Sequence, residues 1–170
     1  MNTAGAHEYG IIDTAQIDFS HEVRKMCEVN TCRKYGTTWA CPPAIGAVEE
    51  CRDRCLKYEK FLVFSGKYQL EDSFDIEGME LAMKEFKTIV AAIDAGIKPH
   101  LSDYLLLGNE GCGTCATCTY PDAPCRFPEN VHGSIEGYGI WVSKVAEAAG
   151  VRYINGENTV TFFGALLYNE

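Results

Sequence analysis

The sequence is poor in basic residues and has no long apolar run. Lysine and arginine together number 15, against 24 aspartates and glutamates, which gives a formal net charge of -9. This balance argues against an attraction to nucleic-acid phosphates or anionic lipid, so we expect neither a nucleic acid nor a membrane as partner. Residues 1–25 show no basic segment followed by an apolar one, and no stretch resembles a membrane span. We therefore expect a soluble, cytoplasmic protein.

Common catalytic signatures are also missing. The chain has no G-x-G-x-x-G, P-loop, H-E-x-x-H or G-x-S-x-G pattern, which lowers the expectation of nucleotide, zinc-protease or serine-hydrolase chemistry. Cysteine, in contrast, is abundant, with nine in 170 residues. In a reducing compartment thiols remain free or bind metals rather than forming disulfides. The functional signal therefore lies in the thiols.

A capping residue and hydrophobic periodicity predict four helices. Their expected ranges are 21–27, preceded by Ser20 as N-cap, then 45–58, 75–96 and 134–150. In the second helix, Cys51 and Cys55 share the apolar face, which favours core packing for Cys55 and leaves Cys51 undecided.

Short apolar runs predict the strands. Residues 61–64 and 103–108 flank the long third helix, which predicts a crossover connection between two parallel strands. Residues 151–154 and 159–168 are expected to close the sheet as a hairpin, after a polar lead-in over residues 1–20. We therefore predict an α/β fold, a single metal-binding domain over residues 1–170. It would have a small mixed or parallel sheet, flanking helices and a cysteine-rich loop that binds a cluster.

Four thiols follow the second predicted strand, in "GCGTCATCTYPDAPCR". Cys112, Cys115 and Cys118 are each separated by two residues, and Cys125 follows after six more. Zinc sites usually take cysteine pairs from two well-separated knuckles, whereas successive thiolates of one tight loop can reach the irons of a cubane. The spacing favours a [4Fe-4S] cluster. A zinc clip, unligated thiols and a dithiol–disulfide site stay open as alternatives.

The fourth thiol departs from the ferredoxin pattern. In that pattern three residues separate the last two cysteines and a proline follows, whereas Cys125 comes later and precedes Arg126. Whether Cys125 closes this cluster or a neighbouring one is open at this point.

A second group of thiols lies near the N-terminus. Cys27, Cys32 and Cys41 are spaced by four and eight residues, and Cys41 directly precedes a proline. A second centre held by three thiolates would leave one iron open to another ligand, solvent or substrate. Cys51 is the nearest candidate for that fourth position. Among the histidines only His132, seven residues after Cys125, is a candidate functional group.

The segments "CEVNTCRKYGTTWACPP", "GCGTCATC", "CRFPE" and "GYGIWV" together resemble the predicted metal-binding family called domain of unknown function 2284. The resemblance extends from about residue 20 to the C-terminus. It implies a small cysteine-rich protein of largely anaerobic bacteria and archaea with iron–sulfur centres. It also implies two ligand sets, which are Cys112, Cys115, Cys118 and Cys125, and Cys27, Cys32 and Cys41. It supplies no reaction.

Three functions fit these features. The first is electron transfer to or from a larger enzyme, whose basic patch would receive the acidic surface of this redox protein. The second is an enzyme with an open iron site that acts on a small substrate. The third is an interaction module stabilised by zinc. The sequence leaves the oligomeric state open.

Overall fold

The computed structural model describes residues 5–109 and 111–170. Its strands are β1 (Glu8–Asp13), β2 (Lys60–Gln69), β3 (Leu105–Leu107) and β4 (Thr159–Tyr168). Its α-helices are α1 (His21–Val29), α2 (Val48–Cys55), α3 (Ile76–Ile97) and α4 (Val142–Ala148). Short 3-10 turns are η1 (Thr14–Gln16), η2 (Pro128–Asn130) and η3 (Glu136–Tyr138).

The four strands form one sheet in the order β1-β2-β4-β3, and every neighbouring pair is antiparallel. β2 and β3 run in the same direction, but β4 lies between them and pairs with both. Leu167 is opposite Phe61 on one side and Leu105 on the other. The predicted α/β fold is confirmed, whereas the predicted parallel pairing of these two strands is not formed. Periodicity identifies a strand, but it does not say which strand lies next to it.

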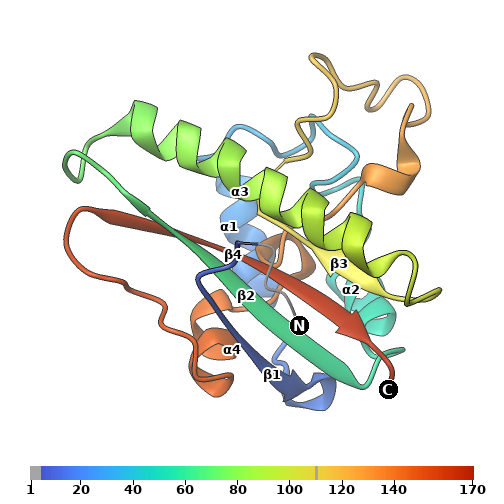
Figure 1. Ribbon diagram of the computed structural model, residues 1–170. Helices are drawn as coiled ribbons and strands as arrows, with labels where there is room; N and C mark the ends of the chain where they lie inside the picture. Colours follow the sequence, from blue (N-terminus) through green and yellow to red (C-terminus); the bar gives the residue numbers. More distant parts are fainter. Residues whose placement is uncertain (1–4, 110) are drawn as a thin grey trace.

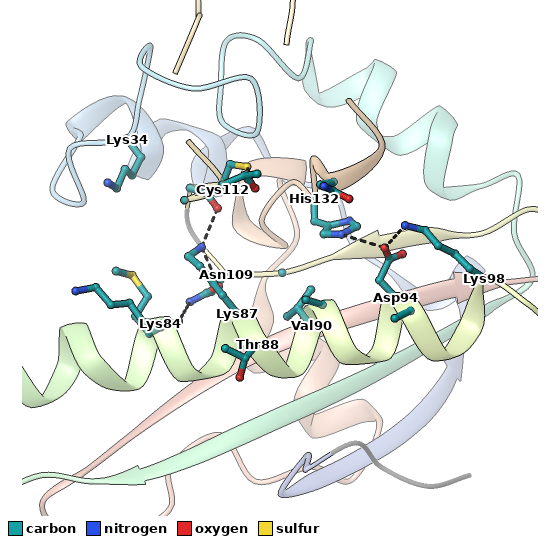
Figure 2. A pocket seen from close by; sticks show the side chains of 18 residues that line it. Lys34, Lys84, Lys87, Thr88, Val90, Asp94, Lys98, Asn109, Cys112 and His132 are labelled. Atoms are coloured by element: carbon teal, nitrogen blue, oxygen red, sulfur yellow. Dashed lines mark hydrogen bonds and ion pairs between the residues drawn. The ribbon is translucent and has the colours of Figure 1, made fainter. Parts of the chain in front are cut away.

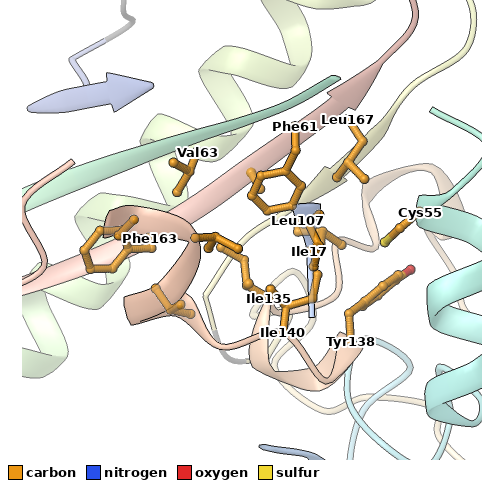
Figure 3. Close-up of a cluster of buried hydrophobic side chains, with 14 of the residues drawn as sticks. Ile17, Cys55, Phe61, Val63, Leu107, Ile135, Tyr138, Ile140, Phe163 and Leu167 are labelled. Carbon is orange, nitrogen blue, oxygen red and sulfur yellow. The ribbon is translucent and has the colours of Figure 1, made fainter. Parts of the chain in front are cut away.

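Helices cover both faces of the sheet (Figure 1). Because side chains alternate along a strand, β2 divides its apolar residues between the two faces. On one face, α3 packs against the sheet through this cluster: Leu62, Phe64, Phe86, Val90, Leu106 and Leu166. On the other face, residues from α2, η3 and α4 join Phe61, Val63 and Leu167 (Figure 3). Burial on both sides explains why β2 and β4 read as continuous apolar runs.

Three predicted helices are confirmed with small changes. Ser20 caps α1, where its hydroxyl accepts a hydrogen bond from the Glu22 amide at 3.1 Å. The second predicted helix forms as α2, with Cys51 and Cys55 both buried. α3 continues one residue beyond Gly96, which was expected to end it. A mid-helix glycine costs only about 1 kcal/mol, which the packing of a long amphipathic helix offsets.

The predicted helix over 134–150 is interrupted. It divides into η3 and α4 because Gly139 adopts φ 78, in the left-handed region. The Gly139 carbonyl accepts a hydrogen bond from the Ser20 amide at 2.7 Å, and a Cβ at position 139 would lie 3.1 Å from the Ser20 carbonyl. The chain therefore turns there to meet the start of α1.

Two predictions at the chain ends are wrong. Residues 8–13 are the edge strand β1 rather than a polar lead-in, and of their side chains only Ile12 is buried, while Tyr9 and Ile11 are about half exposed. Residues 151–154 form no strand, so the expected hairpin is absent. β4 instead pairs along the whole of β2. The apolar residues Tyr9, Ile11 and Ile12 do not alternate regularly with polar ones, and this pattern is too weak to identify an edge strand.

No helix in the described ranges is both long enough and apolar enough to cross a membrane.

The stability of the α3 face should depend on Phe86. Its ring is fully buried and lies 5.8 Å from that of Phe64 and 6.0 Å from that of Phe162. We predict that Phe86→Ala lowers the free energy of unfolding by about 3–5 kcal/mol, since it leaves a large cavity. Urea denaturation monitored by circular dichroism measures this. Phe74→Ala is the matched control, because Phe74 is 87% exposed and its loss should change stability by less than about 0.5 kcal/mol.

Candidate metal centre

The four closely spaced thiols lie in an irregular loop that begins just after β3. This confirms the expectation that the cysteine string follows the carboxyl end of a strand. Gly111 and Gly113, on either side of Cys112, have φ values of 68 and 77. These left-handed conformations favour glycine. The two glycines therefore turn the chain sharply around Cys112.

Hydrogen bonds within this loop bring its two ends together. Arg126 Nη1 donates to the Thr117 carbonyl at 3.0 Å. The Thr119 hydroxyl donates to the Pro124 carbonyl at 2.9 Å, and the Ala123 amide donates to the Thr119 carbonyl at 3.0 Å. Since these bonds span the turn between Cys118 and Cys125, they fold the fourth thiol back toward the first three.

Trp39 attaches this loop to the N-terminal cysteine segment. Its indole Nε1 donates to Thr119 Oγ1 and to the Ala123 carbonyl, both at 3.2 Å. Its ring meets that of Tyr120 edge-on, with centroids 4.9 Å apart. Sequence reasoning did not assign Trp39 a role at the site. The only signal was an aromatic residue two positions before Cys41.

All four thiols of the string line one cavity of about 280 Å³. Cys112, Cys115, Cys118 and Cys125 are each half-buried, and Trp39 and Arg126 also line the cavity. Within residues 5–109 and 111–170, no three Cys, His, Asp or Glu side chains already lie close enough together to hold a single metal ion. Ligation of one metal ion by all four sulfurs would therefore require the loop to tighten around that ion.

Backbone amides surround one of these sulfurs. The N–H group of Tyr120 lowers the pKa of the Cys118 thiol most, and burial opposes this effect. The amides of Trp39 and Thr119 and the charge of Arg126 lower the pKa further. Amides directed at a thiolate are the typical outer-shell partners of a metal-bound cysteine. The donor set fits a thiolate-bound metal.

The three N-terminal thiols form a second group. Cys27 lies inside the last turn of α1, slightly earlier in its helix than predicted, Cys32 is exposed and Cys41 is buried. Burial raises the pKa of Cys27 to about 11, with Glu136, Cys32 and Cys41 adding to the increase and Arg24 opposing it. The three sulfurs are therefore close enough to interact electrostatically.

The two thiol groups meet at Gly111. Burial raises the pKa of Cys41, while a hydrogen bond from Thr38, another from the Gly111 amide, and the charge of Lys87 lower it. Gly111 precedes Cys112 directly. The structure thus places the predicted second ligand set beside the first, although the two sets are 71 residues apart at their closest in the chain.

Cys51 has different neighbours. Its sulfur accepts hydrogen bonds from Arg24 Nη2 at 3.3 Å and Arg54 Nη2 at 3.1 Å. Arg24 is itself buried, and it also donates to the carbonyls of Gly46 and Gly137. Cys51 therefore anchors the buried guanidinium group of Arg24 and the partly buried one of Arg54, and burial raises the pKa of Cys51. Cys55 is fully buried among apolar residues, as predicted.

His132 faces α3 rather than the thiol cavity. Its Nε2 lies 3.9 Å from Asp94 Oδ2, and Lys98 Nζ lies 2.6 Å from the same oxygen (Figure 2). The Tyr104 hydroxyl donates to Asp94 Oδ1 at 2.6 Å. Burial lowers the pKa of His132, although the negative charge of Asp94 opposes the effect. Sequence spacing alone did not predict this partner.

A family model described as "Predicted metal-binding protein (DUF2284)" matches residues 10–168, which include both thiol groups. The chain belongs to the DUF2284 family. No curated protein and no solved structure matches it. The resemblance seen in the cysteine segments is confirmed, and the match to the DUF2284 family model begins earlier, within β1.

The thiol environments predict different reactivities in the metal-free DUF2284 protein. Cys118 and Cys27 are both half-buried, but the pKa of Cys118 is lowered and that of Cys27 is raised to about 11. Because the thiolate is the nucleophile, iodoacetamide should modify Cys118 first at pH 8, where only roughly one Cys27 thiol in a thousand is ionised. Modification of Cys27 should rise with pH toward 11. Mass spectrometry of timed digests measures both, and equal rates at pH 8 would contradict the assignment.

Cys51 should contribute to stability and not to metal binding. We predict that Cys51→Ala lowers the free energy of unfolding by about 2–3 kcal/mol, because two guanidinium groups lose an acceptor. Metal content per folded molecule should not change. Urea denaturation and elemental analysis of the same preparation test this, with Cys55→Ala as the core control. A loss of metal in Cys51→Ala alone would instead make Cys51 a ligand.

Proposed function

We propose that this DUF2284 protein is an iron–sulfur protein whose Cys112, Cys115, Cys118 and Cys125 hold a [4Fe-4S] cluster, and that it transfers electrons to or from a larger enzyme. The observation that carries this proposal is that all four thiols line the same cavity of about 280 Å³. A cluster bound there would accept and release single electrons.

The surroundings of the cavity support this proposal. The amides directed at Cys118 and the positive charge of Arg126 would stabilise negative charge on sulfur. Trp39, whose ring packs edge-on against that of Tyr120, lines part of the cavity wall. Limited access of water, together with N–H groups directed at sulfur, sets the reduction potential of such centres.

The second thiol group supports a second centre. Cys27, Cys32 and Cys41 interact with one another and meet the first loop at Gly111. Two adjacent centres would form a short relay for electrons. Because the formal net charge is -9, we propose that the redox partner offers a basic docking surface. A reducing compartment such as the cytoplasm would keep unligated thiols reduced.

One observation favours a second candidate function, an enzyme with an open iron site. Cys51, the nearest candidate for a fourth N-terminal ligand, is held in the core by Arg24 and Arg54. Three thiolates would then leave one coordination position for a substrate.

Metal analysis of the anaerobically purified chain tests the main proposal. We expect brown protein that contains iron and sulfide, with a visible absorption band that dithionite bleaches. Cys118→Ser should remove this band, or about half of it if the N-terminal centre is also filled. The control Thr117→Ala, in the same loop and exposed, should keep it all. If the N-terminal centre is filled, Cys32→Ser should remove the other half of the band. Colourless protein that contains zinc instead of iron would contradict the proposal.

A further inference from the structure

A groove lined by lysines runs beside the thiol loop. Its cavity has a volume of about 730 Å³, which is in the usual range for small-molecule sites of about 300–1,000 Å³. One face of α3 forms the floor, and Cys112 and His132 belong to the opposite wall (Figure 2). We call it the lysine groove, after the basic residues that line it: Lys34, Lys84, Lys87 and Lys98.

The charge of the lysine groove is opposite to that of the whole chain. Among its described lining residues, four are lysines and one, Asp94, is acidic, although the chain as a whole has a formal net charge of -9. A concave surface with one sign of charge concentrates ligands of the opposite sign. An anion would be repelled by most of this molecule and attracted here.

The positive charge is available mainly at one end. Lys98 and Asp94 form an ion pair at 2.6 Å, so their charges largely offset each other. Lys34 and Lys84, in contrast, form no ion pair within the described part of the chain. Both lysines lie at the end of the groove near Cys112. Lys84 precedes Asp94 by ten residues of α3, which corresponds to about 15 Å along the helix axis.

Lys87 gives this end of the groove a fixed shape. Its Nζ donates to the Gly111 carbonyl at 2.9 Å and to Asn109 Oδ1 at 3.3 Å. These bonds join α3 to the loop that carries Cys112. The end of the groove is therefore preorganised, which reduces the entropic cost of binding a ligand there.

The middle of the groove is apolar. Val90 and Ala91 of α3 lie between the two charged ends, and Ala95 directly follows Asp94. Small side chains at 91 and 95 leave room above the helix, and apolar surface favours an uncharged or hydrocarbon body. The lining thus offers a charged end and an apolar middle to a single ligand.

We propose that the lysine groove binds a small organic anion. Its carboxylate or phosphate group would lie between Lys34 and Lys84 beside Cys112, and its body would lie along Val90, Ala91 and Ala95. This proposal rests on the lysines and the shape of the groove, and not on the metal. If the neighbouring thiols hold a cluster, the ligand would be bound next to its Cys112 edge.

Four probes test the binding of the charged group and of the body separately. Isothermal titration of the full chain would use inorganic phosphate, phenyl phosphate, acetate and benzoate. We expect phenyl phosphate or benzoate to bind with a submillimolar dissociation constant, and to bind at least about tenfold more tightly than phosphate or acetate does. Whichever of phenyl phosphate and benzoate binds more tightly shows whether the groove prefers a phosphate or a carboxylate group. Binding should weaken with added salt.

Matched variants locate the ligand. The double variant Lys34→Gln/Lys84→Gln should weaken binding at least about tenfold. The control Lys57→Gln/Lys67→Gln makes the same charge change at exposed positions outside the groove and should not weaken it. Ala91→Leu should remove the advantage of the phenyl group. Ala92→Leu, the next residue of α3 and not part of the lining, should preserve it.

Three results would overturn the proposal. The first is that no probe binds at millimolar concentration. The second is that both lysine double variants bind the probes equally well. The third is equal affinity for phosphate and phenyl phosphate, and this result would indicate a site for inorganic anions. Iron is measured on the same samples. Binding by iron-free protein would uphold the groove even if the cluster is absent, and iron without binding would uphold only the cluster.

Discussion

The indole of Trp39 donates its N–H to the turn between Cys118 and Cys125, and through this contact two distant cysteine segments become one surface. Thr119, which accepts the hydrogen bond, is 80 residues away in the sequence. Neither segment has regular structure around most of its thiols, so neither can fix the positions of its sulfurs by helix or strand geometry. The positions instead depend on side-chain contacts across the two segments. Side-chain contacts hold a site in place only when a rigid scaffold supports them, and here the β-sheet is that scaffold.

The sequence predicted the elements better than their arrangement. The Ser20 cap, the buried face of α2 and the amphipathic stripe of α3 are local signals, and local physics determines them. The position of β4 between β2 and β3 depends on pairing between segments far apart in the chain. No pattern within one segment reports such pairing, which explains the error in strand order.

The thiol string was found from spacing, because ligands of one loop must follow one another closely in the chain. Its partners could not be found in this way. Trp39, Lys87 and Arg24 approach the cysteines only after the chain has folded. The same holds for the contact between His132 and Asp94. Composition also concealed the lysine groove, because a net charge averages over the whole chain and does not show that four lysines line one groove.

β3 is only three residues long, and among the strands of the described chain its one partner is β4. β4 follows every cysteine in the sequence. During synthesis the nine thiols therefore leave the ribosome before the strand that fixes the base of their loop exists, and long-range pairing of this kind forms slowly. Throughout that interval the sulfurs lack the folded base that positions their loop. A metal centre on these thiols, as proposed above, would therefore depend on when metal reaches the chain relative to the closing of the sheet.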